Sequence, residues 1–320
     1  MTIADNTFTR FDAIGVREQL SNVIANISPT DTPFLTNAKV GKAKNTYFEW
    51  QKDSLAAAVS TNQKLEGDVV ATHTAVVPTI RTGNYVEIAT KDYVLSETVK
   101  AVESAGGANT PGYIAAKLGK EIKRDMEMSL LANKGAVAGS TAAARKSAGL
   151  QAFIRTNYNK DAGATIPDAY TTAPTDTWDA GSTRAFTEAQ VKDVLQQNYN
   201  SGANTSTIMV GAFNKQVFSS FDGIVELMNN AGKGQATITG AANSYVSDFG
   251  TLSVVPNRFQ PQGVAYFIDW SLVQVNYLRP YKVTDLAKTG DNERKLMTVE
   301  YGLQVNTDAG LGIVTDLTTS

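Results

Sequence analysis

The sequence contains no cysteine and only one histidine, His73, among its 320 residues. The absence of cysteine excludes disulfide scaffolds, thiolate zinc sites and thiol nucleophiles, and one histidine cannot build a histidine-rich metal site. Such a chain can assemble in a reducing compartment without a redox step. A serine hydrolase would need His73 as its base, but the residue lies in a loop-like stretch, so we interpret it as a solvated histidine.

Long apolar runs and an excess of basic charge are also missing. No apolar run approaches the roughly 18 residues that a membrane helix needs. The chain has 29 Lys and Arg against 31 Asp and Glu, a net charge of -2, whereas dedicated nucleic-acid readers usually carry a strong basic excess. The segment Met1 to Arg10 shows no signal-peptide pattern. We expect a soluble protein that is not exported through a classical signal and has no membrane partner.

Two sets of charged residues resemble binding sites but lack the pattern that such sites need. Asp53, Glu66 and Asp68 are spaced too openly for a cation-binding loop and are better explained as solvated charges. A small basic patch, formed by Lys39, Lys42 and Lys44, has no interleaved aromatic residues for base stacking. The basic patch therefore favours a solvated linker or a contact to a neighbouring subunit.

Two glycine-containing turns resemble parts of functional motifs but lack the surroundings that those motifs need. Gly232–Gly234 does not follow a strand as a phosphate-binding loop would, and Lys288–Gly290 has no partner serine motif. We predict no catalytic, cofactor-binding or metal-binding residues, no cofactor and no enzymatic activity.

Hydrophobic periodicity predicts several helices. A helix is expected over residues 12–27, followed by a linker over 31–44. The strongest helix spans Thr110 to Lys134, with Pro111 at its first position, and another begins at Thr187 with Gln190 in a capping box. A shorter helix is expected around residues 213–218. In the strongest helix the apolar stripe is Ile114, Leu118, Ile122, Met126 and Leu130, and the opposite, charged face is Lys117, Lys120, Lys123, Arg124 and Glu127.

Short β-branched and aromatic runs predict strands. The expected strands are 46–51, 84–89, 207–210, 252–255, 264–268 and 273–277. The clearest alternation ends the chain, with Met297, Val299, Tyr301, Leu303 and Val305 on one face and Thr298, Glu300, Gln304 and Asn306 on the other. This pattern indicates a long strand with one covered face. The fold class is therefore α+β.

The segment from Lys52 to Arg81 lies between two predicted strands and has few large side chains and no helical period. Long structureless loops are uncommon inside compact domains unless they are functional or disordered. If the flanking strands pair, the segment becomes a long projecting hairpin, and an isolated two-stranded hairpin is only marginally stable in water. We therefore predict that a surface other than the hairpin itself holds this segment.

Seven strings occur in an order that resembles one protein family. They are Thr32-Pro-Phe-Leu35, Phe48-Glu-Trp-Gln51 with Asp53 and Leu55, Leu65-Glu-Gly-Asp68, Lys120-Glu-Ile-Lys-Arg-Asp-Met-Glu127, Gly149-Leu-Gln151, Asp248-Phe-Gly250 with Val255-Pro-Asn-Arg258, and Leu278-Arg-Pro-Tyr281. Together they resemble the major capsid (head) proteins of tailed bacteriophages, in particular the SU10-like subgroup. The resemblance extends from about Thr32 to the C-terminus and is weakest over 136–181.

The resemblance implies a Hong Kong 97-type phage capsid fold. By position, it implies an N-terminal arm at 1–45, an extended loop with flanking strands at 46–92 and a peripheral domain with a spine helix at 93–146. An axial domain at 147–272 and the return strands of the peripheral domain at 273–320 would follow. The resemblance also implies subunits that tilt as the head matures.

The implied function is a virion capsid protein assembled in the host cytoplasm. It would self-assemble through hexamers and pentamers into an icosahedral head that encloses double-stranded DNA without sequence-specific binding. Its further partners would be a portal protein and, where a head uses them, scaffolding or decoration proteins. Near-neutral charge suits this use, because strongly cationic walls would bind packaged DNA tightly.

Three alternatives stay open from sequence alone. An encapsulin-like nanocompartment shell protein would keep the fold but enclose a protein cargo. A non-enzymatic surface or adhesion protein would need an export signal, and an enzyme would need a pocket with a perturbed acid or base.

Overall fold

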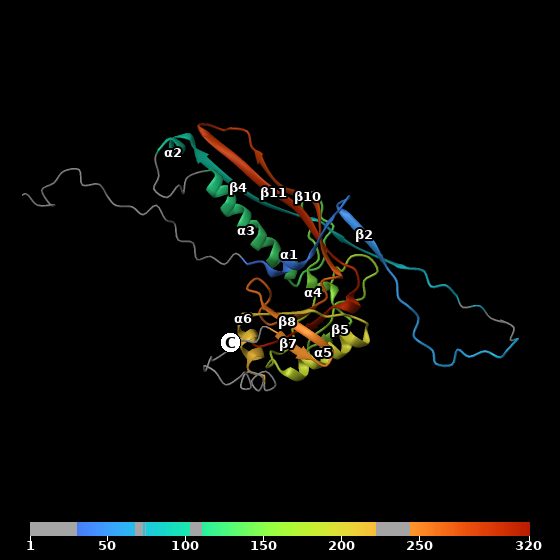
Figure 1. The fold of residues 1–320 in the computed structure, drawn as a ribbon. Coiled ribbons are helices and arrows are strands. Elements are labelled where there is room, and N and C mark those ends of the chain that lie inside the picture. Colours follow the sequence, from blue (N-terminus) through green and yellow to red (C-terminus); the bar gives the residue numbers. More distant parts are fainter. Residues whose placement is uncertain (1–30, 68–72, 74, 103–110, 222–243) are drawn as a thin grey trace, which may run out of the picture.

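The computed structural model describes residues 31–67, 73, 75–102, 111–221 and 244–320. The helix expected over 12–27 and the turn at 232–234 lie outside these residues. The described chain forms two β-sheets, each with helices packed against it, and a separate hairpin that projects to one side (Figure 1). The bounds of the short helical elements are α1 Pro33–Asn37, α2 Glu97–Ala101, α4 Leu150–Phe153 and η2 Asp308–Gly310.

The first sheet has four strands in the order β1-β10-β11-β4. Their bounds are β1 Lys39–Lys42, β10 Val273–Asp285, β11 Asn292–Val305 and β4 Glu87–Ser96. Strand β11 pairs antiparallel with both β10 and β4, and β1 pairs parallel with β10. The predicted strand at 273–277 is thus the first part of a longer strand, whose outer half, from Arg279 to Asp285, is exposed.

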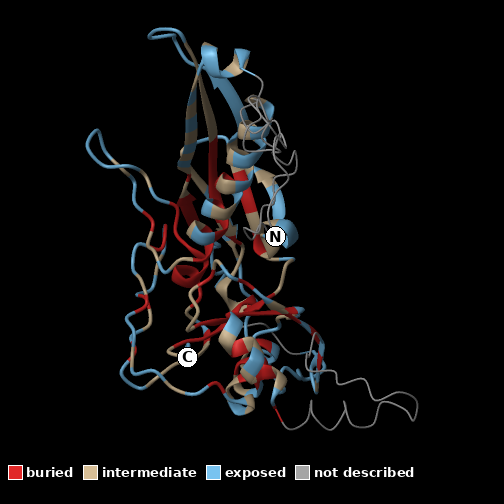
Figure 2. Ribbon diagram, turned by 90° about the vertical axis from the view of Figure 1, so that its left-hand side faces the viewer, coloured by how far each residue is buried: buried red, intermediate tan, exposed pale blue. Residues whose placement is uncertain are grey.

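Helix α3, Pro111–Leu131, lies against this first sheet (Figure 1). Ile122, Met126 and Leu130 are fully buried, as the apolar stripe predicted, and they share a core with residues of β11. Figure 2 shows buried residues concentrated where the helix meets the sheet, while the far end of the sheet is exposed. The predicted helix is confirmed, although it ends at Leu131 and not at Lys134.

The second sheet has six strands in the order β5-β12-β9-β6-β8-β7. Their bounds are β5 Asn157–Asn159, β12 Gly312–Val314, β9 Ala265–Ile268, β6 Thr207–Val210, β8 Gly250–Pro256 and β7 Ser244–Ser247. Strands β6 and β9 are buried along their whole length, because neighbouring strands flank them and side chains pack on both faces. Strand β12, close to the C-terminus, joins this sheet and not the first one.

Two helices pack with the second sheet: α5, Glu188–Asn200, and α6, Ala212–Ser219. The predicted capping box of α5 is present, because the Thr187 backbone N–H donates to the Gln190 side chain at 3.2 Å. Gly202 follows α5 with a φ of 81°, a left-handed conformation that favours glycine. The local signals for both helices are therefore confirmed.

The hairpin consists of β2, Tyr47–Lys52, and β3, Ile80–Tyr85, paired antiparallel from Tyr47–Tyr85 to Lys52–Ile80. The expectation of a single strand over 84–89 is wrong. The chain leaves β3 at Tyr85 and enters β4 at Glu87, and the buried Val86 lies between the two. The break occurs because β3 belongs to the hairpin whereas β4 belongs to the first sheet.

Three further sequence expectations are wrong. Residues 31–44 are not a linker, since they contain α1 and the strand β1. Glu127 and Glu300 do not lie on solvated faces, because both are buried. A contact from a distant part of the chain covers each of the two glutamates, and the pairing of β1 with the distant strand β10 makes residues 39–42 a strand.

Candidate assembly surfaces

The segment between β2 and β3 makes no core of its own and projects away from both sheets (Figure 1). Every described residue from Asp53 to Arg81 is exposed. Of those between Asp53 and Thr79, five have large apolar side chains: Leu55 is 98% exposed, Val76 93%, Leu65 83%, Val77 78% and Val59 67%. We call residues 53–79 the projecting loop. Its apolar residues have no partner within the described chain, as the sequence predicted.

The root of the hairpin, in contrast, is firmly held. The Asn84 side chain is fully buried and donates to the Leu303 carbonyl at 2.7 Å and to the Ser147 hydroxyl at 3.0 Å. Its oxygen accepts from the backbone N–H groups of Ala148 and Tyr85. Asn84 therefore joins the hairpin to β11 and to the segment before α4.

Close packing reinforces this attachment. A Cβ at Gly302 of β11 would lie 2.7 Å from the Phe48 ring and 2.9 Å from the Tyr85 carbonyl oxygen. Only glycine lets the hairpin lie this close to the first sheet. At the outer end of the root, Lys52 pairs with Asp308 at 3.4 Å and lies over the Tyr170 ring.

A second anchored site forms around Glu127 on α3. Its carboxylate accepts the backbone N–H groups of Phe34 and Leu35, both at 2.8 Å, and the Asn257 side-chain amide at 2.7 Å. Among the described residues no cation pairs with it. Burial raises the pKa of Glu127 above its usual value, although these three hydrogen bonds act in the opposite direction.

The Glu127 site brings together three of the strings on which the family resemblance rested. Phe34 and Leu35 come from the segment at 32–35, Glu127 from 120–127 and Asn257 from 255–258. One carboxylate thus links α1, α3 and the loop after β8. Periodicity alone missed it, because Glu127 follows several solvated charges on the same helix.

Two further carboxylates are paired near the root. Burial alone would raise the pKa of Glu87, but the Lys134 charge and hydrogen bonds from Lys134, Ser129 and Tyr301 hold it below its usual value. Glu300 pairs with Arg279 at 2.6 Å and also with Arg145. These pairs supply the partners that a carboxylate removed from water needs.

The far tip of the first sheet is a third polar site. There α2 is tied to the end of β11 by the ion pair between Lys100 and Glu293. Hydrogen bonds from Lys100 and Lys295 lower the pKa of Glu293 to about 2. Glu97 pairs with Lys288 across the same tip. The Lys288–Gly290 segment is therefore part of an ion-paired, exposed tip.

The remaining candidate residues are not brought together. His73, Asp53 and Glu66 are exposed along the projecting loop, and Asp68 lies outside the described residues. Within the described ranges no group of His, Asp or Glu could hold a metal ion, and no helix is long and apolar enough to cross a membrane. Lys39 donates to the Ser271 carbonyl at 2.8 Å, so part of the predicted basic patch takes part in chain contacts.

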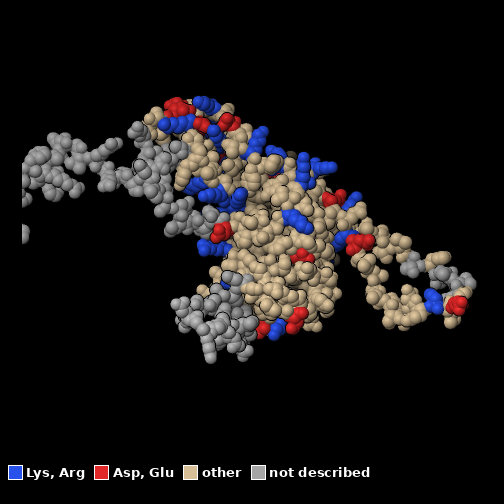
Figure 3. All heavy atoms as spheres, viewed as in Figure 1, with Lys and Arg blue, Asp and Glu red and all other residues tan. Residues whose placement is uncertain are grey.

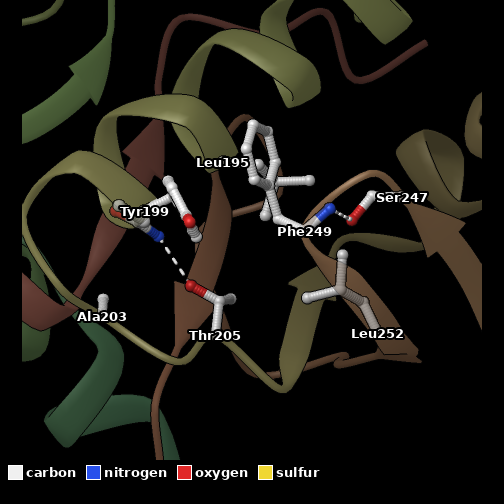
Figure 4. A pocket seen from close by; sticks show the side chains of 8 residues that line it. Leu195, Tyr199, Ala203, Thr205, Ser247, Phe249 and Leu252 are labelled. Carbon is white, nitrogen blue, oxygen red and sulfur yellow. Dashed lines mark hydrogen bonds between the residues drawn. The ribbon is translucent and has the colours of Figure 1, made fainter.

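A recess between α5 and the β7–β8 hairpin is the pocket shown in Figure 4. Its lining residues are Leu195, Asn198, Tyr199, Ala203, Thr205, Ser247, Phe249 and Leu252. The rings of Tyr199 and Phe249 lie 4.9 Å apart at its mouth, and Asn198 donates to the Thr205 hydroxyl at 2.8 Å. This lining holds no carboxylate, amine or imidazole and thus offers no acid–base pair.

The fold defines the class of protein. The capsid of cyanophage A-1(L) matches with a TM-score of 0.68 over 97% of this chain and 100% of that chain, at 13% identity. An encapsulin of Synechococcus elongatus matches with a TM-score of 0.58 over 95% of this chain and 93% of that chain, at 10% identity. The chain therefore has the Hong Kong 97-type shell fold, a fold that a phage capsid and an encapsulin both have.

The sequence itself defines the family. The model of the SU10 major capsid protein family matches residues 2–318. The major capsid protein of Escherichia phage Phieco32 is 26% identical over 351 aligned positions, which cover 96% of this chain and 96% of that protein. The chain belongs to the SU10 major capsid protein family. The expected fold and the expected phage capsid function are confirmed, and the encapsulin-like and adhesion alternatives are not supported.

Proposed function

We propose that many copies of this chain form hexamers and pentamers that close into an icosahedral phage head around double-stranded DNA. Assembly takes place in the host cytoplasm. A portal protein and, where the head uses them, scaffolding or decoration proteins are its partners. The chain acts as a structural subunit and not as an enzyme, and the shell encloses the DNA without sequence-specific binding.

The same proposal divides the chain by position. Residues 1–45 form the N-terminal arm, 46–92 the extended loop with its strands and 93–146 the peripheral domain with the spine helix α3. Residues 147–272 form the axial domain. Residues 273–320 supply the return strands β10 and β11, and β12 extends the sheet of the axial domain.

The observation that best supports this proposal is the exposed apolar surface of the projecting loop. Burying one exposed Leu or Val side chain stabilises an interface by about 1.5 to 3 kcal/mol, and the loop offers five such side chains. No described part of the same chain covers them. A neighbouring copy that did so would be held at several contacts at once, and multivalent attachment slows dissociation because rebinding is effectively intramolecular.

The test is negative-stain electron microscopy of the purified chain and of a variant that lacks residues 54–76. Since Lys52 pairs with Ile80, the deletion leaves four residues to close the hairpin: Asp53, Val77, Pro78 and Thr79. We expect the full chain to form closed shells and the variant to unfold at the same temperature but form no shells.

Normal particles from the deletion variant would show that the projecting loop does not tile the shell. A full chain that stays monomeric at every salt and protein concentration would overturn the proposed function itself.

A further inference from the structure

The charges on α3 fall into two groups with different surroundings. Glu121 and Asp125 both lie near Lys91 of β4, at 3.9 and 3.0 Å. Four cations of the same helix have no such partner: Lys117, Lys120, Lys123 and Arg124 make no ion pair with any residue that the structure describes. We call these four residues the basic stripe. Figure 3 shows Lys and Arg side chains gathered over the N-terminal half of α3.

The spacing of the basic stripe places like charges next to one another. Lys117, Lys120 and Arg124 follow at intervals of three and four residues, so their side chains lie in a row about 10 Å long. Such like-charge pairs destabilise a helix by roughly 0.2 to 0.5 kcal/mol each. A negatively charged partner laid along the row would remove this repulsion.

Arg124 adds a second observation. Its guanidinium lies over the Phe259 ring, 5.4 Å from the centroid, which fixes the side chain at the edge of the stripe. Its Nε–H is buried and has no hydrogen-bond partner among the residues that the structure describes. Buried donors are usually satisfied, so an unsatisfied one beside three exposed lysines points to an acceptor that lies outside the described residues.

We infer that the basic stripe is the surface that contacts the phosphate backbone of the enclosed duplex DNA, an inference that rests on the proposed function. Lys and Arg bind phosphates without reading sequence, as the lining of a DNA container requires. The chain as a whole has a net charge of -2, so the stripe is a local exception to a near-neutral composition.

The projecting loop of a neighbouring copy is a poorer match for the stripe. Its tip carries Lys64, Glu66 and Asp68, a net charge of one negative unit against four positive ones. The rest of the loop, residues 53–63 and 69–79, contains Asp53 at its base and otherwise no Asp, Glu, Lys or Arg. Charge complementarity therefore favours DNA over the projecting loop of a second copy as the occupant.

The test compares two variants of the full chain with equal loss of charge. One carries Lys117→Gln, Lys120→Gln and Lys123→Gln and keeps Arg124, because that residue packs on Phe259. The control carries Lys44→Gln, Lys146→Gln and Lys282→Gln, three exposed lysines that make no ion pair within the described chain. Binding of a short fluorescent DNA duplex to dissociated subunits is measured by anisotropy over a series of KCl concentrations.

Each lost phosphate contact lowers the slope of log affinity against log salt by about 0.9. We expect the stripe variant to lose roughly 2 to 3 units of slope, while the control loses less than one and both variants still form shells. Equal slopes in the two variants would overturn the inference. A stripe variant that alone fails to form shells, with unchanged DNA binding, would assign the stripe to a contact between copies and also overturn it.

Electron microscopy of the unmodified chain separates the two hypotheses. Failure of that chain to form shells would count against the proposed function, whereas a changed salt slope would still report on the stripe.

Discussion

The root and the projecting loop belong to the same hairpin but are stabilised in different ways. At the root, Asn84 is fully buried and Gly302 lets the hairpin lie against β11. A few residues further along, Leu55 and Val76 are almost fully exposed. The root is thus stabilised within one chain, whereas the loop has apolar surface that no described part of the same chain covers.

This difference separates folding from assembly. Substitutions at the root should lower the stability of the isolated chain, and substitutions in the loop should leave stability unchanged but impair shell formation. The predictions below test that separation, beginning with the largest expected change in stability.

Replacing Asn84 with alanine should destabilise the chain by about 3 kcal/mol, because the buried N–H groups of Ala148 and Tyr85 would lose their acceptor. Chemical denaturation measures the change. The control is Asn45→Ala, in the same segment but exposed, with an expected change within about 0.5 kcal/mol. Equal effects of the two substitutions would show that the root is not specially anchored.

Replacing Gly302 with alanine should cost about 2 kcal/mol, because the new methyl group would collide with the Phe48 ring and the Tyr85 carbonyl. The matched control is Gly119→Ala in α3, where the new Cβ would lie 3.9 Å from the Met297 sulfur, an ordinary contact. That substitution should stabilise the helix, by up to about 1 kcal/mol. Opposite signs in thermal unfolding are expected, and a neutral Gly302→Ala would contradict the close packing of the hairpin.

The substitution Glu127→Gln tests a second attachment within one chain, that of α1 to α3. Glutamine places a donor where the carboxylate accepts a backbone N–H, so we expect a loss of about 1 to 2 kcal/mol near neutral pH. Glu121→Gln on the same helix is the control, since Glu121 is only half-buried and lies 3.9 Å from Lys91.

The pKa of Glu127 also gives this site a pH dependence. Because its pKa is raised in the folded chain, the folded state keeps a proton that the unfolded state loses above about pH 4.5. The stability of the unmodified chain relative to Glu127→Gln should therefore fall as the pH rises from 4.5 through the raised pKa, and then level off. Denaturation curves over that pH range measure this difference in unfolding free energy. A difference that grows with pH would show that folding lowers the pKa of Glu127 and does not raise it.

The smallest change in stability is expected in the projecting loop. Leu55→Ser combined with Val76→Ser should change the unfolding free energy by no more than about 0.5 kcal/mol, since both side chains are exposed. Shell formation should nevertheless need a protein concentration roughly tenfold or more higher, because each interface loses apolar contacts. Thr61→Ser is the control, and light scattering during assembly provides the measurement. If the double substitution strongly lowered the unfolding free energy but left shell formation normal, the loop would stabilise the fold of the chain and not its assembly.

Much of the secondary structure could be predicted from local sequence. The period of Ile122, Met126 and Leu130 predicted the buried face of α3, and the Thr187 capping box predicted the start of α5. Alternation predicted the buried face of β11, where Val299, Tyr301 and Leu303 are buried. These signals are reliable because they depend on neighbours within one helix or strand.

Local sequence could not predict what covers the other faces. Glu127 is buried because Phe34 and Leu35 are brought onto it, and Glu300 because Arg145 and Arg279 meet it. Likewise β1 pairs with β10, more than two hundred residues away. A residue's periodicity shows which face it lies on, but not which distant segment lies over that face.

From its sequence alone, the chain determines its helices and strands and the lack of any core between Lys52 and Arg81, since apolar period and content are local properties. Only the tertiary structure decided that Asn84, Glu127 and Gly302 are the attachment points. Their partners lie between about 60 and 250 residues away in the chain, and such contacts arise only once the sheets have formed.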